Sequence, residues 1–230
     1  MMQRLGLMGR VLSRQLSLPR HHLTTHLAEF ARLVGPMPLI LDIGSGRLAP
    51  YRPLFQYDRY LTLDYFEQAD VRADGENLPF ASGVARLALA TEVFEHLPNP
   101  PQALAEIRRV LEEGGYLLIT VPLIWGVHDY VDYQRWTARG LTKLLDEAGF
   151  EIVRLKHRGG IFSMIGCMTA QIPTQLFGPM AQQRRWWVAA VYAVCWAMLA
   201  PLPWLGSLLD HFDRAQDFTL GYSVLCRKKL

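Results

Sequence analysis

The sequence predicts an α/β fold, with a mostly parallel sheet and helices packed on both of its faces. Two observations lead to this prediction. From residue 39 to residue 158, short apolar runs of strand length alternate with stretches of helical periodicity. A glycine-rich bend, Gly44-Ser45-Gly46, follows the first apolar run, and the acid Asp64 ends the second. Parallel strands bind ligands at their carboxyl ends, so this bend and this acid mark the expected ligand site.

Length and charge restrict what the chain can be. A chain of 230 residues suits one domain, or one domain with an elaboration. A net charge of +3 gives no electrostatic reason to expect a nucleic-acid partner. Three cysteines, Cys167, Cys195 and Cys226, lack the spacing of a disulfide framework or a metal site. Four arginines and no acid precede Glu29, so we expect residues 1–35 to form a basic amphipathic helical segment, with an organellar transit peptide as the alternative.

The first half of the sheet is predicted from apolar runs. Four runs predict parallel strands, at residues 39–43, 60–64, 69–73 and 85–91. Asn99 followed by two prolines is typical of a helix start, so a helix is expected over residues 102–113. Gly114-Gly115 is expected to end that helix.

The second half follows the same alternation. Residues 116–122 predict a fifth strand, and residues 150–157 predict a sixth. Between them, Thr137 can cap a helix that ends at Gly149. This region therefore continues the alternation of strands and helices.

The glycine bend has the features of a nucleoside site. Gly44 and Gly46 let the backbone turn sharply and approach a ligand without interference from Cβ atoms. Asp64 stands about twenty residues further on, where a carboxylate can accept both hydroxyls of a ribose. The spacing formally fits a dinucleotide fingerprint, but Pro50 and Pro53 interrupt the long helix whose N-terminus would hold a pyrophosphate. The loop therefore favours a ligand with a ribose and no phosphates.

A family resemblance covers just over half of the chain. Four segments match class I S-adenosylmethionine-dependent methyltransferases in order and spacing: "LDIGSG", "LTLD", "ADGENLPFASGVARLALATEVFEHLPNPPQALAEIRRVLEEGGYLLITVP" and "HDYVDYQRWT…LTKLLDEAGF". The region resembles in particular the bacterial methyltransferase-domain group. The resemblance implies a Rossmann-like, seven-stranded, mostly parallel sheet with an antiparallel last strand, and S-adenosyl-L-methionine as the cofactor.

The resemblance also implies roles for single residues. The glycine bend, with Asp42 organising it, would lie under the methionine part of the cofactor. Asp64 would bind the ribose, and Asp74 would face the adenine amino group beside Gly75. Thr91 and Glu92 would border the sulfonium. The predicted cofactor-binding residues are thus Asp42, Gly44, Ser45, Gly46, Asp64, Asp74, Gly75, Thr91 and Glu92.

One stretch departs from the family pattern. The usual third small residue and long helix after the glycine bend are replaced by "RLAPYRPLF". Tyr51 and Arg52 are therefore candidates for contacts with the cofactor or the acceptor.

Two histidines are candidates for proton transfer. His128 follows the fifth strand, on the side from which an acceptor must approach, and is the preferred general base. His96 is a second candidate, although it can instead close a helix C-terminus. Asp132 and Arg135 are expected to pair with each other and to brace the helix that begins after Thr137. Methyl transfer from a sulfonium can also proceed by alignment alone, without a base.

A hydrophobic insertion separates the last two strands. Residues 36–157 and 218–230 are expected to form the methyltransferase core, with residues 218–228 as the last strand beside residues 150–157. Residues 158–217, where the family core needs only a short loop, include "WWVAAVYAVCWAMLAPLPWL", twenty residues without a charge. We expect this insertion to be helical and to act as a lid or a membrane-associated element.

Topology limits how this insertion can meet a membrane. A single crossing is excluded, because it would place the last strand on the opposite side from its sheet. Pro201 and Pro203 are expected to end a helix near Ala200. Three interpretations remain: a helical subdomain that dips into one leaflet, which we prefer; a buried lid or subunit interface; and a hairpin that crosses twice.

The sequence thus predicts a cytoplasmic methyltransferase, peripheral on the inner face of a membrane. Residues 158–217 and the basic N-terminus would make the membrane contact. The acceptor oxygen, nitrogen or carbon is expected on a small-molecule, amphiphilic or lipid-linked molecule, and no nucleic-acid partner is expected. The alternatives are a nicotinamide-dependent oxidoreductase and a catalytically inactive membrane-associated scaffold.

Overall fold

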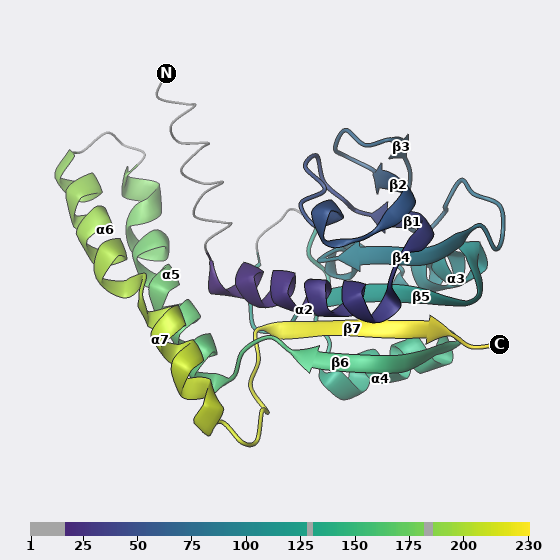
Figure 1. The fold of residues 1–230 in the computed structure, drawn as a ribbon. Coiled ribbons are helices and arrows are strands. Elements are labelled where there is room, and N and C mark those ends of the chain that lie inside the picture. The colour runs from purple at the N-terminus through teal and green to yellow at the C-terminus, as the bar shows by residue number, and fades with distance from the viewer. Residues whose placement is uncertain (1–16, 128–130, 182–185) are drawn as a thin grey trace. The chain divides into compact units, whose positions relative to one another are not determined.

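The computed structural model describes residues 17–127, 131–181 and 186–230 (Figure 1). Their contacts divide the chain into two compact units. The sheet unit consists of Leu23–Lys156 and Gly221–Leu230, and the hairpin unit contains His157–Leu220 together with the N-terminal residues up to His22. Residues 1–16, which hold three of the four arginines of the predicted basic segment, lie outside the described residues; α2 (Leu18–Val34) is the first helix that the structure describes.

The sheet unit is built on seven strands in the order β3-β2-β1-β4-β5-β7-β6. They are β1 (Met37–Ile43), β2 (Tyr57–Asp64), β3 (Val71–Arg72), β4 (Ala85–Thr91), β5 (Leu111–Pro122), β6 (Phe150–His157) and β7 (Gly221–Lys228). The pairs β1–β2, β2–β3, β1–β4 and β4–β5 are parallel, whereas β7 runs antiparallel to β5. The amide of Lys229 donates to the carbonyl of Gly149, so the end of β7 lies beside the start of β6. This is the Rossmann-like methyltransferase fold, and β7 lies beside β6 as predicted.

Apolar side chains cover both faces of this sheet, because successive strand residues point to opposite sides. On one face, Leu27 and Phe30 of α2 pack in a buried cluster with Ile40 of β1. On the other face, Leu41 of the same strand belongs to a cluster with residues of α3 (Pro100–Val110) and α4 (Ala138–Glu147). Figure 1 shows α2 and α4 on opposite sides of the sheet. The sheet is therefore buried between two helical layers, and its carboxyl edge is left for loops.

Both predicted helix caps are present. The Asn99 side chain accepts a hydrogen bond from the Gln102 amide at 3.4 Å, and Thr137 accepts one from the Gly140 amide at 3.2 Å. Such caps satisfy amide groups that have no partner inside the helix. They fix where α3 and α4 begin, and both starts face the carboxyl edge of the sheet.

The helix expected over residues 102–113 ends earlier than the sequence suggests. α3 stops at Val110, and β5 begins at Leu111, whose pairing with Ala85 precedes a shift of register. Gly114, with a φ of +67°, lies within β5 and does not end a helix. The reason is burial: Leu111 is completely buried in the sheet, a contact that outweighs the helical periodicity of the sequence.

The hairpin unit holds three apolar helices between β6 and β7 in the sequence. They are α5 (Ile161–Ala181), α6 (Trp186–Leu199) and α7 (Leu202–Leu209), followed by η3 (Asp210–Phe212). α5 lies beside α6 and α7 (Figure 1). The break between α6 and α7 falls at Ala200–Pro201, where proline was expected to end the helix.

One stretch among the described residues, Trp187–Phe212, is long and apolar enough to cross a membrane by length and composition. Only 11% of its most apolar window is buried. The Ala200–Pro201 break divides this stretch, and α6, whose 14 residues begin one residue before it, is the longest continuous helix that it includes.

Candidate active site

The glycine bend turns the chain out of β1 in the way the sequence predicts. Gly44 and Gly46 have φ values of +65° and +59°, a backbone region that favours glycine. A Cβ atom on Gly44 would lie 2.4 Å from Val93 Cγ2, whereas one on Gly46 would meet no atom within 4 Å. The amide of Ser45 donates to the Leu63 carbonyl at 3.1 Å. The bend is thus packed on the Gly44 side and open on the Gly46 side, where a ligand can approach the backbone.

Asp64 joins this bend to the end of β2. Its Oδ2 accepts a hydrogen bond from the Gly46 amide at 3.0 Å. Its Oδ1 accepts from the amides of Phe66 and Glu67 at 2.9 and 2.8 Å. A carboxylate offers about four acceptor positions, so one remains for a ligand hydroxyl. The side chain is therefore fixed in place and keeps one acceptor position, which serves one of the two ribose hydroxyls that the sequence assigned to it.

Asp74 and Gly75 form a tight turn after β3. The Asp74 Oδ1 accepts a hydrogen bond from the Glu76 amide at 2.9 Å, and its carbonyl accepts one from Asn77. A Cβ atom on Gly75 would contact Ile43, the last residue of β1, at 3.6 Å. This turn therefore adjoins the end of the strand that leads into the glycine bend.

Thr91 and Glu92 lie at the end of the central strand β4. Glu92 has a φ of +55°, which costs a residue other than glycine about 1–3 kcal/mol. Its amide donates to the Thr120 carbonyl at 3.1 Å, and Thr120 Oγ1 donates to the Glu92 carboxylate at 3.0 Å. Thr91 itself is buried. These bonds hold the Glu92 side chain toward β5, at the edge where the sulfonium is expected.

Asp42 is a buried acid beneath the glycine bend. It is 2% exposed, and Tyr60 donates a hydrogen bond to its Oδ2 at 2.7 Å. Burial raises the pKa of Asp42 to about 7; the bond from Tyr60 lowers this pKa, and the negative charge of Asp64 raises it. Near neutral pH the Asp42 carboxyl group is thus partly protonated. Its burial and its bond from Tyr60 fit a residue that organises the glycine bend.

The segment that replaces the usual family helix is occupied by aromatic contacts. η1 (Arg52–Leu54) is the short helix found there. Arg52 Nε donates to the Tyr57 hydroxyl at 2.7 Å, and its guanidinium lies 5.4 Å from the ring centres of Tyr57 and Tyr60. Tyr51 is buried. The contacts that the structure gives Arg52 are therefore with these two tyrosines.

His96 is oriented by the loop that follows β5. It belongs to η2 (Phe94–His96), its Nδ1 contacts the carbonyl oxygen of Val131, and its Nε2 lies 3.8 Å from a carboxylate oxygen of Glu95. A carbonyl can only accept, so Nδ1 must carry the hydrogen, and Nε2 is the acceptor in the neutral ring. The preferred base, His128, lies outside the described residues.

The expected pair of Asp132 and Arg135 is present. Arg135 Nη2 donates to Asp132 Oδ2 at 2.7 Å, and the Asp132 side chain is 1% exposed. The Tyr133 amide also donates to the Glu95 carbonyl at 2.8 Å. This segment is thereby fastened to η2, just before the Thr137 cap.

The sequence reasoning missed two polar residues of this edge. Glu95 is completely buried beside His96, and Thr120 of β5 holds Glu92. The sequence offers no signal for Thr120, because a threonine inside an apolar strand is ordinary. The sequence shows Glu95 beside His96, but only the fold shows that the Glu95 side chain is buried.

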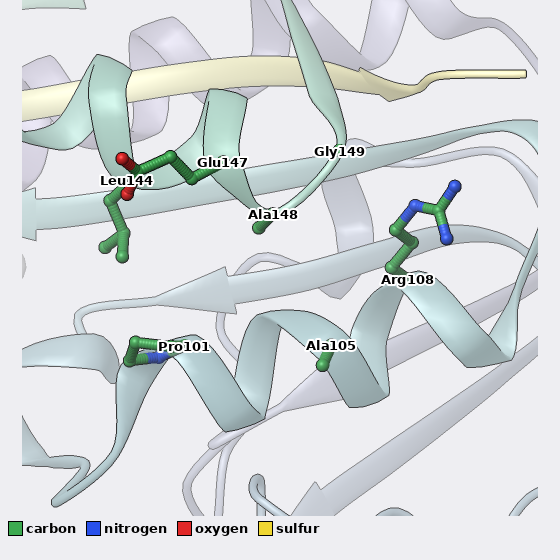
Figure 2. A pocket seen from close by; sticks show the side chains of 7 residues that line it. All are labelled: Pro101, Ala105, Arg108, Leu144, Glu147, Ala148 and Gly149. Atoms are coloured by element: carbon green, nitrogen blue, oxygen red, sulfur yellow. The ribbon is translucent and has the colours of Figure 1, made fainter.

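A groove of about 450 Å³ lies elsewhere in the sheet unit, between α3 and α4 (Figure 2). It is lined by Pro101, Ala105, Arg108, Leu144, Glu147, Ala148 and Gly149. None of these is a predicted site residue. The predicted cofactor site at the carboxyl edge of the sheet therefore does not coincide with this groove.

Comparison with known proteins finds a methyltransferase domain in part of the chain. Residues 41–119 match the model of a family described as a methyltransferase domain. No curated protein matches the sequence.

Similar solved structures share the fold at low sequence identity. A Burkholderia thailandensis 1,6-didemethyltoxoflavin-N1-methyltransferase with bound S-adenosylhomocysteine is 17% identical, with a TM-score of 0.56, over 96% of this chain and 83% of that one. A Haemonchus contortus phosphoethanolamine N-methyltransferase is 14% identical, with a TM-score of 0.54, over 90% of this chain and 52% of that one. The [4+2]-cyclase SpnF is 20% identical, with a TM-score of 0.56, over 90% of this chain and 80% of that one.

The residues present fit the cofactor of this family. The bend is open beside Gly46, and Asp64 retains an acceptor position. Residues 41–119 thus match a methyltransferase domain, and the sheet has the methyltransferase fold, which is consistent with a class I S-adenosylmethionine-dependent methyltransferase.

Proposed function

We propose that this enzyme methylates an oxygen, nitrogen or carbon atom of an amphiphilic or lipid-linked acceptor at a membrane surface. One observation carries the proposal: an insertion of three apolar helices, with much of its apolar surface exposed, stands between β6 and β7. Exposed apolar patches of this kind mark contacts with lipid, ligand or protein. An enzyme that works on lipid-linked molecules needs such a contact.

The exposed residues support lipid as the contact. Large apolar side chains are exposed on all three helices, with exposed fractions of 59% for Leu176, 72% for Met198 and 71% for Leu208. Trp187, Trp196 and Trp204 are also exposed, and tryptophan is enriched where proteins meet the membrane interface. No charged side chain is present in α5, α6 or α7. Arg184 and Arg185, expected to face anionic headgroups, lie outside the described residues.

A hydroxyl, N–H or C–H group that is methylated loses one proton as its bond to the methyl carbon forms. S-adenosylmethionine, when bound, would supply the methyl group and would keep the electron pair of the broken carbon–sulfur bond. His128, which lies outside the described residues, remains the preferred base, and His96, whose Nε2 is the acceptor nitrogen in the neutral ring, is the second candidate. Replacing the base that acts should lower turnover about 100-fold or more while leaving cofactor affinity nearly unchanged. Near-normal turnover in both His96→Asn and His128→Ala would mean that no histidine base is used.

Transfer of a radiolabelled methyl group tests the proposal directly. The enzyme is incubated with methyl-labelled S-adenosylmethionine and either a total membrane-lipid extract or the water-soluble metabolites of the same cells. We expect label in the lipid fraction. Label in the water-soluble fraction alone would refute the acceptor class while preserving the methyltransferase activity. The Asp64→Asn variant, which should bind the cofactor poorly, controls for transfer by a contaminant.

A further inference from the structure

Charged residues are sparse in the insertion. In residues 158–217 the sequence has Arg158, Arg184, Arg185 and four charged residues from Asp210 to Asp217. Arg184 and Arg185 lie outside the described residues. The helices α5, α6 and α7, as far as the structure describes them, carry no charged side chain. An uncharged, apolar length of this kind is what the hydrocarbon of a bilayer requires of a segment that enters it.

The chain enters and leaves the hairpin at the same end. The Asp210 carboxylate accepts hydrogen bonds from the amides of Gly160 and Ser163 at 2.7 and 3.1 Å. Asp213 accepts one from the Ile161 amide at 2.9 Å. These bonds satisfy the free amides at the start of α5 and tie them to the end of α7. A hairpin closed in this way can enter a membrane and return to the side on which it started.

Glycine contacts set the register of the two legs near this closed end. A Cβ atom on Gly206 would lie 2.3 Å from the Phe162 carbonyl oxygen, and one on Gly166 would lie 2.6 Å from the Leu202 carbonyl oxygen. α5 and α7 are therefore in backbone contact, as helices packed through small residues are in membranes. Further along, Thr174 Oγ1 lies 3.5 Å from the Tyr192 hydroxyl of α6.

The length of the hairpin matches a bilayer. α5 has 21 residues, and at 1.5 Å per residue it is about 32 Å long, close to the roughly 30 Å of a hydrocarbon core. It continues through Pro173, which membrane helices tolerate. Gln171 and Gln175 are its unfavourable residues, so α6 and α7 carry the more apolar leg.

α6 also lacks the polar face of a helix that lies on a membrane. Exposed large apolar side chains lie on one side of it, at Trp187, Val191, Val194 and Met198, and on the opposite side at Trp196. A helix in the interfacial plane keeps one charged or polar face toward water. A helix that is apolar all round belongs in a protein core or across a membrane, and α6, which packs along α5, keeps most of its described side chains exposed.

The tryptophans fall at regular depths along this register. Trp204 lies between the two glycine contacts, about one turn from the closed end. Trp196 lies one turn beyond Tyr192 toward that end, about 14 Å from the start of α5, and Trp187 lies about 27 Å from it. Two tryptophans thus stand near the ends of the apolar length and one near its middle. Interfacial tryptophans flank spanning segments in this way.

We infer that α5 and the α6–α7 leg enter the hydrocarbon together and cross it as a two-legged hairpin. The inference rests on the proposed membrane function and makes it more specific. It replaces the shallow insertion into one leaflet that the sequence favoured.

Depth-dependent fluorescence quenching tests this inference. Variants of the full chain keep one tryptophan each, at 187, 196 or 204, with the others changed to phenylalanine. They are bound to vesicles of phosphatidylcholine and phosphatidylglycerol brominated at shallow or deep acyl positions. We expect Trp196 to lose more fluorescence to deep bromines, and Trp187 and Trp204 to lose more to shallow ones. A variant that keeps Trp136, which packs against the core of the sheet unit, is the unquenched control.

The possible results distinguish a hairpin that crosses the membrane from membrane contact in general. Equal, shallow quenching at all three positions would overturn the crossing hairpin and leave membrane contact intact. No quenching at any position would overturn both. Amide hydrogen exchange on the unaltered protein gives the same answer without substitutions: vesicles should protect the middle of α5 around Ile172 most if the hairpin crosses.

A matched pair of valines gives a second readout. Val194 is 59% exposed on α6, about level with the middle of the hairpin, and Val153 is 48% exposed on β6. Val194→Arg should abolish vesicle binding, whereas Val153→Arg should leave it unchanged. Equal binding by both variants would contradict burial of this face in hydrocarbon.

Discussion

The carboxylate of Asp64 accepts a hydrogen bond from the backbone amide of Gly46 at 3.0 Å, and this bond joins the ends of two neighbouring parallel strands. It brings an acid and an open glycine bend to one place at the carboxyl edge of the sheet. The predicted contact with the ribose depends on this relationship.

Asp64→Asn should weaken binding of S-adenosylhomocysteine about 10- to 100-fold, because hydrogen bonds to a charged group contribute about 1.5–3 kcal/mol. Titration calorimetry measures this change. Asp58→Asn is the matched control, since Asp58 is exposed on the same strand. Equal losses in both variants would show that the effect is general charge and not a specific contact.

Gly44→Ala and Gly46→Ala should separate stability from binding. Both alanines would need a positive φ, which costs about 1–2 kcal/mol. Only the Gly44 methyl group would also collide with Val93, so Gly44→Ala should lower the free energy of unfolding more. Gly46→Ala should mainly weaken cofactor binding. Urea denaturation and calorimetry measure the two effects, and adding Val93→Ala should restore part of the stability lost in Gly44→Ala.

Stability should depend on pH through Asp42. Its pKa is raised from 3.8 to about 7 in the folded protein, so the folded state holds this proton more tightly than the unfolded state. The protonated Asp42 side chain therefore stabilises the folded state fully below pH 4. This stabilisation is lost as the pH rises toward 7, and about 1.4 kcal/mol per unit of pKa shift is its upper bound.

An asparagine at position 42 does not titrate, so Asp42→Asn should not lose stability between pH 5 and pH 8 as the unaltered protein does. The free energy of unfolding of the variant minus that of the unaltered protein should therefore be higher at pH 8 than at pH 5. Denaturation in urea at the two pH values measures the difference. An identical difference at both values would show that Asp42 does not bind the proton in the folded state.

Asp210→Ala should loosen the closed end of the hairpin. The substitution removes the acceptor of the first amides of α5, and loss of a helix cap costs about 0.5–2 kcal/mol. Faster amide exchange at Phe162 and Ser163 should report it. The exposed neighbour His211→Ala should leave those amides unchanged. Protection that survives in Asp210→Ala would assign the cap to Asp213 alone.

The sequence predicts local structure best where one residue type has one physical use. Asn99 before two prolines and Thr137 before a helix both act as caps, and Pro201 breaks the helix where expected. The glycine bend was also predictable, because Gly44 and Gly46 adopt conformations that other residues rarely take.

Long-range contacts explain what the sequence could not predict. α3 ends at Val110 because Leu111 is buried in a sheet formed with a distant strand. Asp42 finds its partner in Tyr60, and Glu92 finds its partner in Thr120, only when separate strands meet. The register of α5 against α7 depends on glycine contacts between the two helices, which no periodicity reveals.

The most direct test of the account is calorimetric titration of the unaltered chain with S-adenosylhomocysteine and, separately, with NAD. The bend, the acid at Asp64 and the lack of a long helix after β1 predict that S-adenosylhomocysteine binds one molecule per chain and that NAD gives no binding heat. Binding of NAD without binding of S-adenosylhomocysteine would contradict the assignment of this edge to a methyltransferase cofactor.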